Sequence, residues 1–569
     1  MFNRRWLTAW RLFRSGKFRE IFVRSLKILK RSSVKYEVDY TKWHRTWVDL
    51  NDDKRNQILE SIESLPERPS FAIFCTVDDV NPSLLFRTIQ SIRAQIYPNW
   101  ILFITNTTPF DHDFSTKIDS LGDSRIKLTT TNGDVYNSDA SNNWIVELSP
   151  NTQLHEAALF VAAVSSIENP QTKIMYCDHD HLNIKGEFCD PHMKPRWNPD
   201  LFAAIDYMAP FVVCEKELWK TNRNRKDTQH DFLLKATKTI SDDLILHMPY
   251  VLASVYISDD KSHLFPLVRK VKHSLPIPEP LVSILIPTRD QGKLLGKCLQ
   301  SLYEKTDYKN FEVVLIDHQS SEKSALKIIE TYEEKENFRL IEFSGAFNFS
   351  AMMNQAASVA KGQILVLLNN DTEVLESMWL AELVSQVSRP EVGIVGALLL
   401  FGDGSIQHAG VHPGVGGLMG HGHKHLHGDS AGYFNRLKVV HEVSAVTGAC
   451  LAIEKSVWDD LGGLDEQNLT VAYNDVDLCL KAREKGFRII FTPFAKLMHH
   501  ESVSRGSDDD PSINERLNQE INVMMRRWDD LLEYDPAYSP NLSRESNNFD
   551  LSEKPRVIPM WKKFVKNPL

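Results

Sequence analysis

Six acidic or imidazole side chains in the second half of the chain have types and spacing suited to chemistry on a phosphorylated substrate. Mg²⁺ is typically held by one or two protein carboxylates together with substrate phosphates, and Mn²⁺ accepts the same ligands and also an imidazole. A further carboxylate away from the cation could act as a general base toward a hydroxyl. The six are Asp317, Asp371, Asp475, Asp477, His499 and His500.

Asp371 combined with one of the two histidines predicts an open cation site that leaves coordination positions for a diphosphate. Each motif is weak by itself, because Asn-Asn-Asp is usually a turn and Asp-x-Asp on a helix is usually a solvated face. The prediction therefore depends on the elements that bring these residues together.

Apolar stretches with polar ends predict the strands that position the site. The stretches 282–291, 308–317 and 365–374 follow this pattern and are separated by helical patterns. Strands that alternate with helices indicate βαβ units and a mostly parallel sheet, which binds ligands beyond the carboxyl ends of its strands. Asp317 and Asp371 both fall at such ends.

Counterparts of these stretches occur about two hundred residues earlier, at 70–79, 97–106 and 145–154. The first copy lacks the chemical groups of the second. Asn106 stands in place of Asp317, Asn151 in place of Asp371, Gln229 in place of Asp475, and Ser254 and Val255 near the place of the histidines. This pattern predicts a duplicated domain whose first copy kept its framework and lost its chemistry.

The composition is that of an ordinary globular protein with more than one domain. Of 569 residues, 42% are hydrophobic and 25% are charged. No apolar run approaches the roughly 18 residues of a membrane-spanning helix, and no secretory signal is evident. The seven cysteines are scattered without a Cys-x-x-Cys pair, which favours reduced thiols in a cytoplasmic protein over disulfides or structural zinc.

Positive charge is concentrated at the N-terminus. Residues 1–35 hold eleven Lys and Arg residues and one acid, Glu20, while the remainder holds 55 basic and 74 acidic residues. An acidic body argues against a nucleic-acid partner. The arm also has an apolar stripe typical of an interfacial membrane helix, although a helix packed on its own domain would show the same pattern. The stripe comprises Trp6, Trp10, Phe13, Phe18, Ile21, Phe22, Leu26 and Leu29.

Taken in order, the motifs of the second copy resemble those of a bacterial family 2 glycosyltransferase of the GT-A fold, of the type that makes O-antigen and related surface polysaccharides. The resemblance covers about 282–506. It runs through VSILIPTRD, NFSAMMNQAA, AKGQILVLLNNDTEV, GSIQHAGV, VSAVTGACLAI, GGLDEQNLTVAYNDVDLCLK and MHHESVSRG. The first copy, with YCDHDHLNIKG, MKPRWNPDL and QHDFLLKA, resembles the N-terminal half of two-domain members.

This resemblance implies an α/β protein with two tandem GT-A-like domains, each Rossmann-like with a mostly parallel sheet, and with a basic helical N-terminal arm and a helical C-terminal tail. The expected boundaries are 1–65 for the arm and linker, 66–275 for the degenerate domain, 276–510 for the catalytic domain and 511–569 for the tail.

The resemblance also implies roles for single residues. Asp371 would bind Mg²⁺ or Mn²⁺ together with His499, which is favoured over His500. Asp475 would be the catalytic base, although the Glu that precedes it in the family is Asn474 here. Residues expected to bind the donor are Thr288, Asp290, Asp317, Asn369 and Asn370. Further candidates for contact with donor or acceptor are Gln407, His408, Asp477 and His500.

The implied activity is an inverting, metal-dependent hexosyl or deoxyhexosyl transfer from a nucleotide-diphosphate sugar to a hydroxyl of a growing, lipid-linked glycan. The enzyme would lie in the cytoplasm, peripheral at the inner face of the cell membrane. The alternative is a non-catalytic subunit of a polysaccharide assembly complex that binds glycan or nucleotide sugar.

One histidine-rich segment admits two interpretations. His421, His423, His425 and His427 alternate in GHGHKHLHGD, which could be a soft-metal tract. The surrounding glycines could equally form a flexible loop on the acceptor side.

Overall fold

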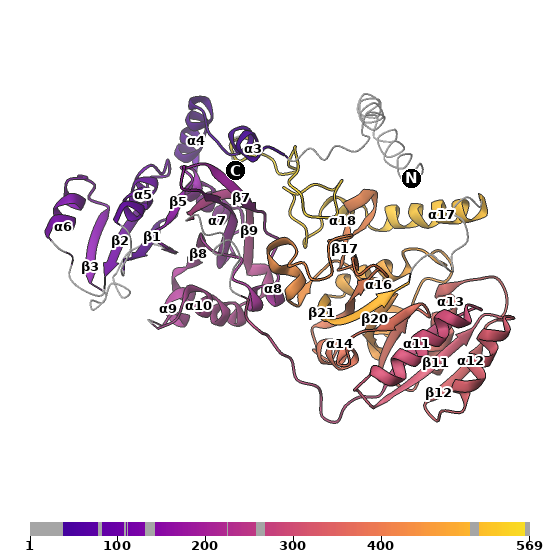
Figure 1. Ribbon diagram of the computed structural model, residues 1–569. Helices are drawn as coiled ribbons and strands as arrows, with labels where there is room; N and C mark the ends of the chain where they lie inside the picture. The colour runs from indigo at the N-terminus through magenta and orange to yellow at the C-terminus, as the bar shows by residue number, and fades with distance from the viewer. Residues whose placement is uncertain are drawn as a thin grey trace.

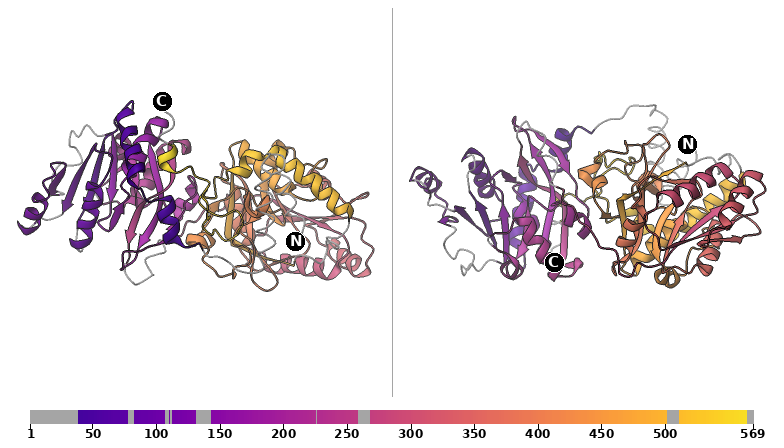
Figure 2. Two further views of the ribbon diagram at one scale, coloured as in Figure 1. Left: turned by 90° about the horizontal axis from the view of Figure 1, so that it is seen from above. Right: turned by 60° about the horizontal axis from the view of Figure 1, so that its bottom comes forward.

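The structure is a computed structural model. It describes residues 38–77, 82–106, 110, 112–130, 143–224, 226–257, 268–500 and 511–563. Two α/β lobes stand side by side, the first indigo to magenta and the second pink to yellow (Figure 1), and they remain separate lobes in the further views of Figure 2. The predicted pair of tandem α/β domains is therefore confirmed. The predicted basic arm, 1–35, lies outside the described residues.

The first domain is built on a mixed sheet. Its strands are β1 (Phe71–Thr76), β2 (Trp100–Asn106), β3 (Ile126–Thr130), β4 (Trp144–Leu148), β5 (Thr152–Leu154), β6 (Ile174–Leu182), β7 (Phe188–His192), β8 (Val212–Glu215) and β9 (Ile245–Tyr256). They lie in the order β3-β2-β1-β4-β8-β6-β9-β5, with β7 beside β6.

The second domain repeats this topology in the order β12-β11-β10-β13-β20-β15-β21-β14. Its main strands are β10 (Val282–Thr288), β11 (Phe311–Asp317), β12 (Phe338–Glu342), β13 (Ile364–Leu368), β14 (Thr372–Val374), β15 (Val392–Leu400), β20 (Cys450–Glu454) and β21 (Arg488–His499). Short strands are β16 (Ile406–His408), β17 (Val411–Pro413), β18 (Met419–His421) and β19 (His441–Glu442). The strands β10 to β13 pair in parallel, whereas β20 is antiparallel to both of its neighbours.

Helices cover both sheets. The first domain has α3 (Tyr40–Trp47), α4 (Asp52–Ser64), α5 (Pro82–Arg93), α6 (His112–Asp119), α7 (Ala158–Glu168), α8 (Pro199–Ala204), α9 (Lys216–Asn222) and α10 (Gln229–Ala236). The second has α11 (Gly292–Lys305), α12 (Lys323–Glu333), α13 (Phe349–Val359), α14 (Trp379–Val387), α15 (Lys455–Leu461) and α16 (Asn474–Glu484). The C-terminal segment contains α17 (Pro511–Arg527), α18 (Asp529–Glu533) and α19 (Met560–Lys563).

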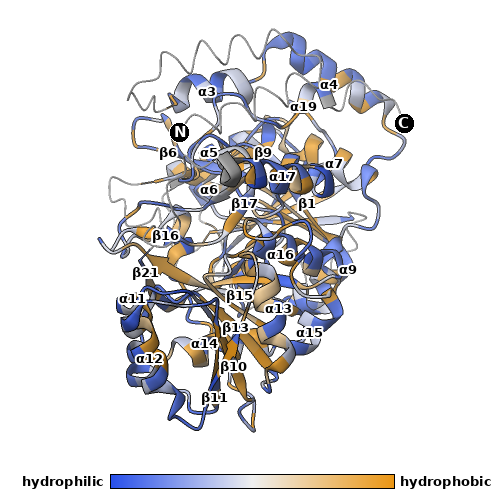
Figure 3. Ribbon diagram, turned by 90° about the vertical axis from the view of Figure 1, so that its right-hand side faces the viewer, coloured by the Kyte–Doolittle hydropathy of each residue, from blue (hydrophilic) through white to orange (hydrophobic). Residues whose placement is uncertain are grey.

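The period-two pattern of β13 explains why the second sheet lies between two helical layers. Ile364 and Val366 face a core shared with α11 and α14, while Leu365 and Leu367 face a core shared with α13, α15 and α16. All five residues of β13 are buried, so the strand is apolar on both faces, as central parallel strands are. Figure 3 shows these strands in orange among bluer helices.

The edge strands of the two sheets place Asn151 and Asp371 at equivalent positions. Each residue directly precedes the edge strand, β5 or β14. The Tyr256 N–H donates to the Asn151 carbonyl at 3.0 Å, and the His500 N–H donates to the Asp371 carbonyl at 2.9 Å. This confirms that the second copy has a carboxylate where the first has an amide.

The histidine pair aligns one residue later than the sequence comparison predicts. β5 and β14 pair in the same way with β9 and β21, so that His499 corresponds to Val255 and His500 to Tyr256. The sequence comparison placed the pair near Ser254 and Val255. The strands fix this register through hydrogen bonds, which ungapped alignment of two divergent segments does not reveal.

The helix α4, within the segment predicted as arm and linker, packs on the core of the first domain. Leu50, Ile58 and Ile62 are buried in the first core together with Trp561 of the C-terminal segment. The predicted helical tail is helical in α17, α18 and α19, but 534–559 has no helix and runs across both domains. Within the described residues, no helix combines the length and apolarity needed to cross a membrane.

Candidate functional site

The predicted metal ligands meet at the edge of the second sheet. Asp371 lies in the turn between β13 and β14, and His499 is the last residue of β21, which pairs with β14. Asp371 Oδ1 is 3.1 Å from His499 Nε2, and both side chains are largely buried. The fold therefore brings together two residues that are far apart in the sequence.

Gln407 orients the imidazole of His499. Its Oε1 lies 2.6 Å from His499 Nδ1, and because an amide oxygen can only accept a hydrogen bond, Nδ1 carries the proton. Nε2 then carries the lone pair; it lies 3.1 Å from Asp371 Oδ1 and accepts a hydrogen bond from Asn369 Nδ2 at 3.2 Å. This fixes the tautomer in the form that binds a metal.

A divalent cation fits between Asp371 and His499. An ion bound at roughly 2.0–2.1 Å by two adjacent octahedral ligands holds those two atoms about 3 Å apart, close to the 3.1 Å observed. Mn²⁺ accepts a carboxylate with an imidazole, and Mg²⁺ favours carboxylate oxygens. Among the described residues, no group of three or more His, Cys, Asp or Glu side chains could hold a metal, so substrate oxygens and water would complete the coordination.

His500 has a different environment from His499. Its Nε2 lies 3.3 Å from Glu373 Oε2. In the first domain the equivalent pair is neutral, because the Tyr256 hydroxyl donates to Gln153 Oε1 at 2.6 Å. The contact between these two positions occurs in both copies with different side chains, which indicates a structural role for His500. The geometry therefore favours His499 as the metal ligand.

Three of the predicted donor-binding residues, Thr288, Asn369 and Asn370, are linked at the turn 369–371 between β13 and β14. Thr288, at the end of β10, accepts a hydrogen bond from Asn370 Nδ2 at 2.9 Å. Asn369 is anchored through its backbone N–H, which donates to the Ala449 carbonyl at 3.0 Å. The ends of β10 and β13 are thereby held together as one surface.

Asp317 and Asp290 shape the loop between β11 and α12. Asp317, the last residue of β11, accepts a hydrogen bond from the Ser320 N–H at 3.1 Å. Asp290 Oδ1 accepts from the N–H groups of Glu322 and Ser321 at 2.7 and 2.6 Å, and these hydrogen bonds lower the pKa of Asp290. The Asp290 carboxylate is thus turned toward this loop.

Asp475 stands at the start of α16 with a fixed orientation. The backbone N–H groups of Gly448 and Val476 donate to its two oxygens at 2.7 and 2.8 Å. The residue after Gly448, Ala449, accepts a hydrogen bond from the Asn369 N–H through its carbonyl. The loop of Gly448 and Ala449 therefore links Asp475 to the turn 369–371. The residue is half-buried, which leaves the carboxylate accessible to a substrate.

Asp477 points into the protein, away from such a position. It is 1% exposed, and its oxygens contact Lys481 at 2.7 Å, Arg527 at 3.1 Å and the indole N–H of Trp528 at 3.0 Å. These partners tie α16 to the end of α17. The structure does not bring Asp477 to the candidate site, and this geometry favours a structural role.

His408 is also buried, at 1% exposure, with its Nδ1 2.9 Å from His421 Nδ1. Burial lowers the pKa of His408 well below its usual value and keeps the ring neutral. Other histidines of the tract have separate partners, because His423 accepts from the Tyr433 N–H and His425 stacks on Phe401. This dispersal argues against a metal-storing tract.

The first domain lacks the same chemistry at the equivalent places. The Asn151 amide donates to the Tyr256 carbonyl at 3.5 Å, and the Gln229 amide donates to the Glu147 carbonyl at 3.2 Å. Val255, at the position of His499, has no group able to bind a metal. All seven cysteines of the chain are free, as predicted, and Cys450 and Cys479 are buried.

Two features of the site have no clear signal in the sequence. Gln407 is a predicted substrate contact, but the structure places its oxygen against His499. Gly448 provides the N–H group that orients Asp475, and only its position before β20 could have pointed to it. Both contacts join residues that are distant in the sequence.

The chain is similar in sequence to several known proteins. Residues 283–444 match the family model described as "Glycosyl transferase family 2". An uncharacterized protein, y4gI, of Sinorhizobium fredii is 34% identical over 91% of this chain and 62% of that protein. The O-antigen biosynthesis protein RfbC of Myxococcus xanthus is 28% identical over 87% of this chain and 42% of that protein.

The chain spans about half the length of these two relatives. Among solved structures, the mannosyltransferase PcManGT from Pyrobaculum calidifontis in complex with GDP-Man and Mn²⁺ is 18% identical, with a TM-score of 0.34 over 46% of this chain and 72% of that chain.

Proposed function

We propose that this protein, whose residues 283–444 match the model of glycosyl transferase family 2, transfers a sugar from a nucleotide-diphosphate donor to a hydroxyl of a growing glycan, with inversion at the sugar carbon. One observation carries the proposal. Asp371 and His499 face each other at 3.1 Å, with the tautomer of His499 set by Gln407, whereas their counterparts in the first domain, Asn151 and Val255, supply neither a carboxylate nor an imidazole.

The residues around this pair would hold the donor. Asp371 and His499 would bind Mg²⁺ or Mn²⁺, which when bound stabilises the negative charge of the departing diphosphate. Asp317 and Thr288, at the ends of neighbouring strands, would contact the nucleoside. Asn370, bonded to Thr288, keeps the nucleoside and metal portions of this surface in a fixed relation.

Asp475 would act as the general base. Its carboxylate is held by the N–H groups of Gly448 and Val476 and retains lone pairs that can accept the proton of an acceptor hydroxyl. The hydroxyl oxygen then forms the new bond to the sugar as the bond to the diphosphate breaks. A single displacement of this kind inverts the configuration.

A non-catalytic subunit that binds glycan or nucleotide sugar is the alternative. The fixed tautomer of His499 and the backbone cradle of Asp475 favour an enzyme, because simple binding needs neither. Turnover of a donor that depends on a divalent cation, and stops with a chelator, would exclude the alternative.

The acceptor and location belong to the same proposal. The name of the Myxococcus xanthus relative supports a role in O-antigen or related polysaccharide synthesis. In this proposal the acceptor would be lipid-linked, and the donor sugar would be a hexose or deoxyhexose. The basic, aromatic-rich segment 1–35 would hold the enzyme on the cytoplasmic face of the membrane.

The two copies provide a matched test. Asp371→Ala should abolish cation-dependent release of nucleotide from the donor, whereas Asn151→Ala, at the equivalent position of the first domain, should leave turnover unchanged. The donor would first be identified by thermal shift with a panel of nucleotide sugars and Mn²⁺. If Asn151→Ala were the damaging change, the active domain would be the first one.

A further inference from the structure

The first domain contains a pocket of about 760 Å³ on the side of its sheet edge that faces α5. This volume is within the roughly 300–1,000 Å³ of small-molecule sites. Its walls come from α5, from β5 and β9, and from the segment that joins α3 to α4. In the described residues 268–281 that precede β10, the second domain has no helices equivalent to α3 and α4, which help to form this pocket in the first copy.

The titratable groups on one side of the pocket contact one another. Arg55 donates to Glu156 through two nitrogens, at 2.7 and 2.9 Å. His44 Nδ1 lies 2.9 Å from Asp49 Oδ1, and burial lowers the pKa of His44 to about 4, so that it is neutral near pH 7. This side therefore offers no free positive charge to a ligand.

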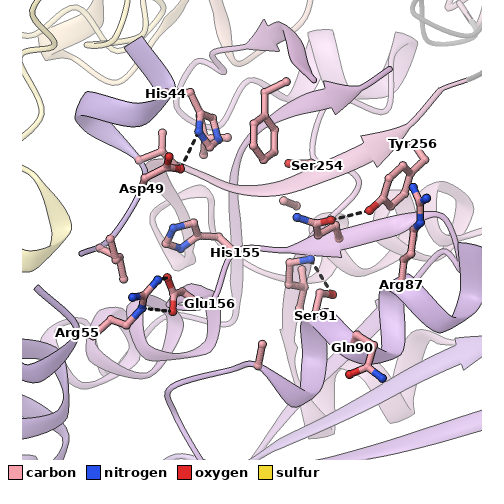
Figure 4. Close-up of a pocket in the computed structure, with 18 of the residues that line it drawn as sticks. His44, Asp49, Arg55, Arg87, Gln90, Ser91, His155, Glu156, Ser254 and Tyr256 are labelled. Atoms are coloured by element: carbon pink, nitrogen blue, oxygen red, sulfur yellow. Dashed lines mark hydrogen bonds and ion pairs between the residues drawn. The ribbon is translucent and has the colours of Figure 1, made fainter. Parts of the chain in front are cut away.

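The opposite side carries one cation, Arg87, for which the described part of the chain provides no acidic partner. Figure 4 shows Arg87 and Tyr256 on the other side of the pocket from the Arg55–Glu156 and His44–Asp49 pairs. The Arg87 guanidinium lies 5.1 Å from the centre of the Tyr256 ring, and among the described residues it makes no ion pair. The Tyr256 hydroxyl is bonded to Gln153, whose amide nitrogen can still donate.

The second domain has charged residues at the corresponding positions. By the alignment of TIQSI with CLQSL, Arg87 corresponds to Lys297, while Gln153 corresponds to Glu373. Glu373 lies near both Lys305, at 3.6 Å, and His500, at 3.3 Å. The first copy has thus exchanged a network of charges for a neutral Tyr–Gln pair beside an unpaired guanidinium.

This lining selects a class of ligand. A nucleoside diphosphate would meet only one unpaired cation and two carboxylates, Asp49 and Glu156. A purely apolar ligand would leave the Arg87 guanidinium and the amide nitrogen of Gln153 facing hydrocarbon. A saccharide fits a lining that has little positive charge but retains polar groups. Its C–H faces pack on aromatic rings, and its hydroxyls bond to amide, hydroxyl and guanidinium groups.

We propose that this pocket binds a short oligosaccharide, neutral or with one acidic group, whose acidic group or hydroxyls contact Arg87. The inference rests on the proposed transfer reaction for the class of ligand and extends it with a second glycan site away from Asp371 and His499. The growing glycan could be held there while its end is extended in the second domain.

The test is binding of the full chain to an array of bacterial oligosaccharides, some neutral and some containing one uronic acid. The wild type should retain at least one member of the array, and Arg87→Ala and Tyr256→Ala should weaken that binding by about tenfold or more. Lys297→Ala is the matched control at the equivalent exposed position and should bind as the wild type does.

Arg87 is exposed, so Arg87→Ala should fold, and its release of nucleotide from the donor with Mn²⁺ should match the wild type. If Arg87→Ala weakens the binding of uronic-acid ligands alone, Arg87 pairs with a carboxylate. If it weakens the binding of both neutral and uronic-acid ligands, Arg87 bonds to hydroxyls. Absence of any bound saccharide, unchanged binding by both pocket variants, or displacement of the glycan by free nucleoside diphosphate would overturn the proposal. Failure of donor turnover would instead reject the proposed reaction.

Discussion

At the scale of single residues, α16 offers two nearby carboxylates with opposite environments. Asp475 is half-buried, with its oxygens held by two backbone N–H groups, whereas Asp477 is buried among basic and indole partners. The pattern Asp-x-Asp does not distinguish them. Their environments assign substrate chemistry to the first and packing to the second.

Replacing Asp475 with Asn should lower turnover by roughly 10²–10⁴-fold, because the positioned base is lost while its shape is kept. Donor affinity should change little, since Asp475 faces the acceptor in the proposed mechanism. Steady-state kinetics with separate measurement of donor binding would check both expectations. Turnover near that of the wild type would remove Asp475 from this role.

Gln407 is expected to act through His499 rather than on the substrate. Gln407→Ala frees the imidazole to rotate and to change tautomer, and should reduce Mn²⁺ affinity or activity by roughly 10–100-fold. Titration of the protein with Mn²⁺ followed by calorimetry in the presence of donor would measure the change. His500→Ala is the control, because its ring contacts Glu373, and an equal loss there would contradict the assignment.

At the scale of elements, the two sheets have the same edge-strand pairing but carry different side chains at the edge. The edge strand pairs with its neighbour in the same register in both domains, which brings the residue before β5 or β14 to the end of β9 or β21. In the second domain this meeting point holds Asp371 and His499. In the first it holds Asn151 and Val255, and the adjacent face forms a pocket instead.

The attachment of α16 to α17 can be tested through Asp477. Asp477→Asn removes the buried carboxylate that contacts Lys481, Arg527 and the Trp528 indole, while Arg527 keeps its ion pair with Asp465. The change should lower the free energy of unfolding by roughly 1–3 kcal/mol. Urea denaturation would measure this change. Asp475→Asn, two residues away, should leave the free energy of unfolding nearly unaltered, and equal destabilisation by both variants would show that Asp475 is structural too.

At the scale of the whole molecule, the C-terminal segment joins the two domains. Asp535 accepts from the Ser444 hydroxyl and lies 2.9 Å from His412 Nδ1, both in the second domain. A few residues later, the Asn541 amide donates to Asp178 of the first domain at 2.8 Å. Arg389 and Asp200 form a direct ion pair between the domains.

The same scale includes the proposed contact with the membrane through residues 1–35. Each Lys or Arg near an anionic surface contributes about 1 kcal/mol, screened by salt. Deletion of 1–35 should therefore reduce sedimentation with anionic vesicles, and high salt should reproduce part of that loss. Transfer to a small soluble acceptor should persist, because every proposed catalytic residue lies beyond 280.

Vesicle binding by the truncated chain equal to that of the full chain would contradict the membrane assignment. Unfolding of the truncated chain would indicate that the segment packs on its own domain.

The sequence by itself determined the duplication, the α/β class and the placement of Asp317 and Asp371 at strand ends, because hydrophobic periodicity and strand order are local properties. Only the tertiary structure decided which histidine faces Asp371, that Gln407 sets its tautomer, and that Asp477 is turned inward. These depend on contacts between segments tens to hundreds of residues apart. The pocket beside Arg87 has the same origin, since its walls come from four segments whose meeting is set by packing and not by any local pattern.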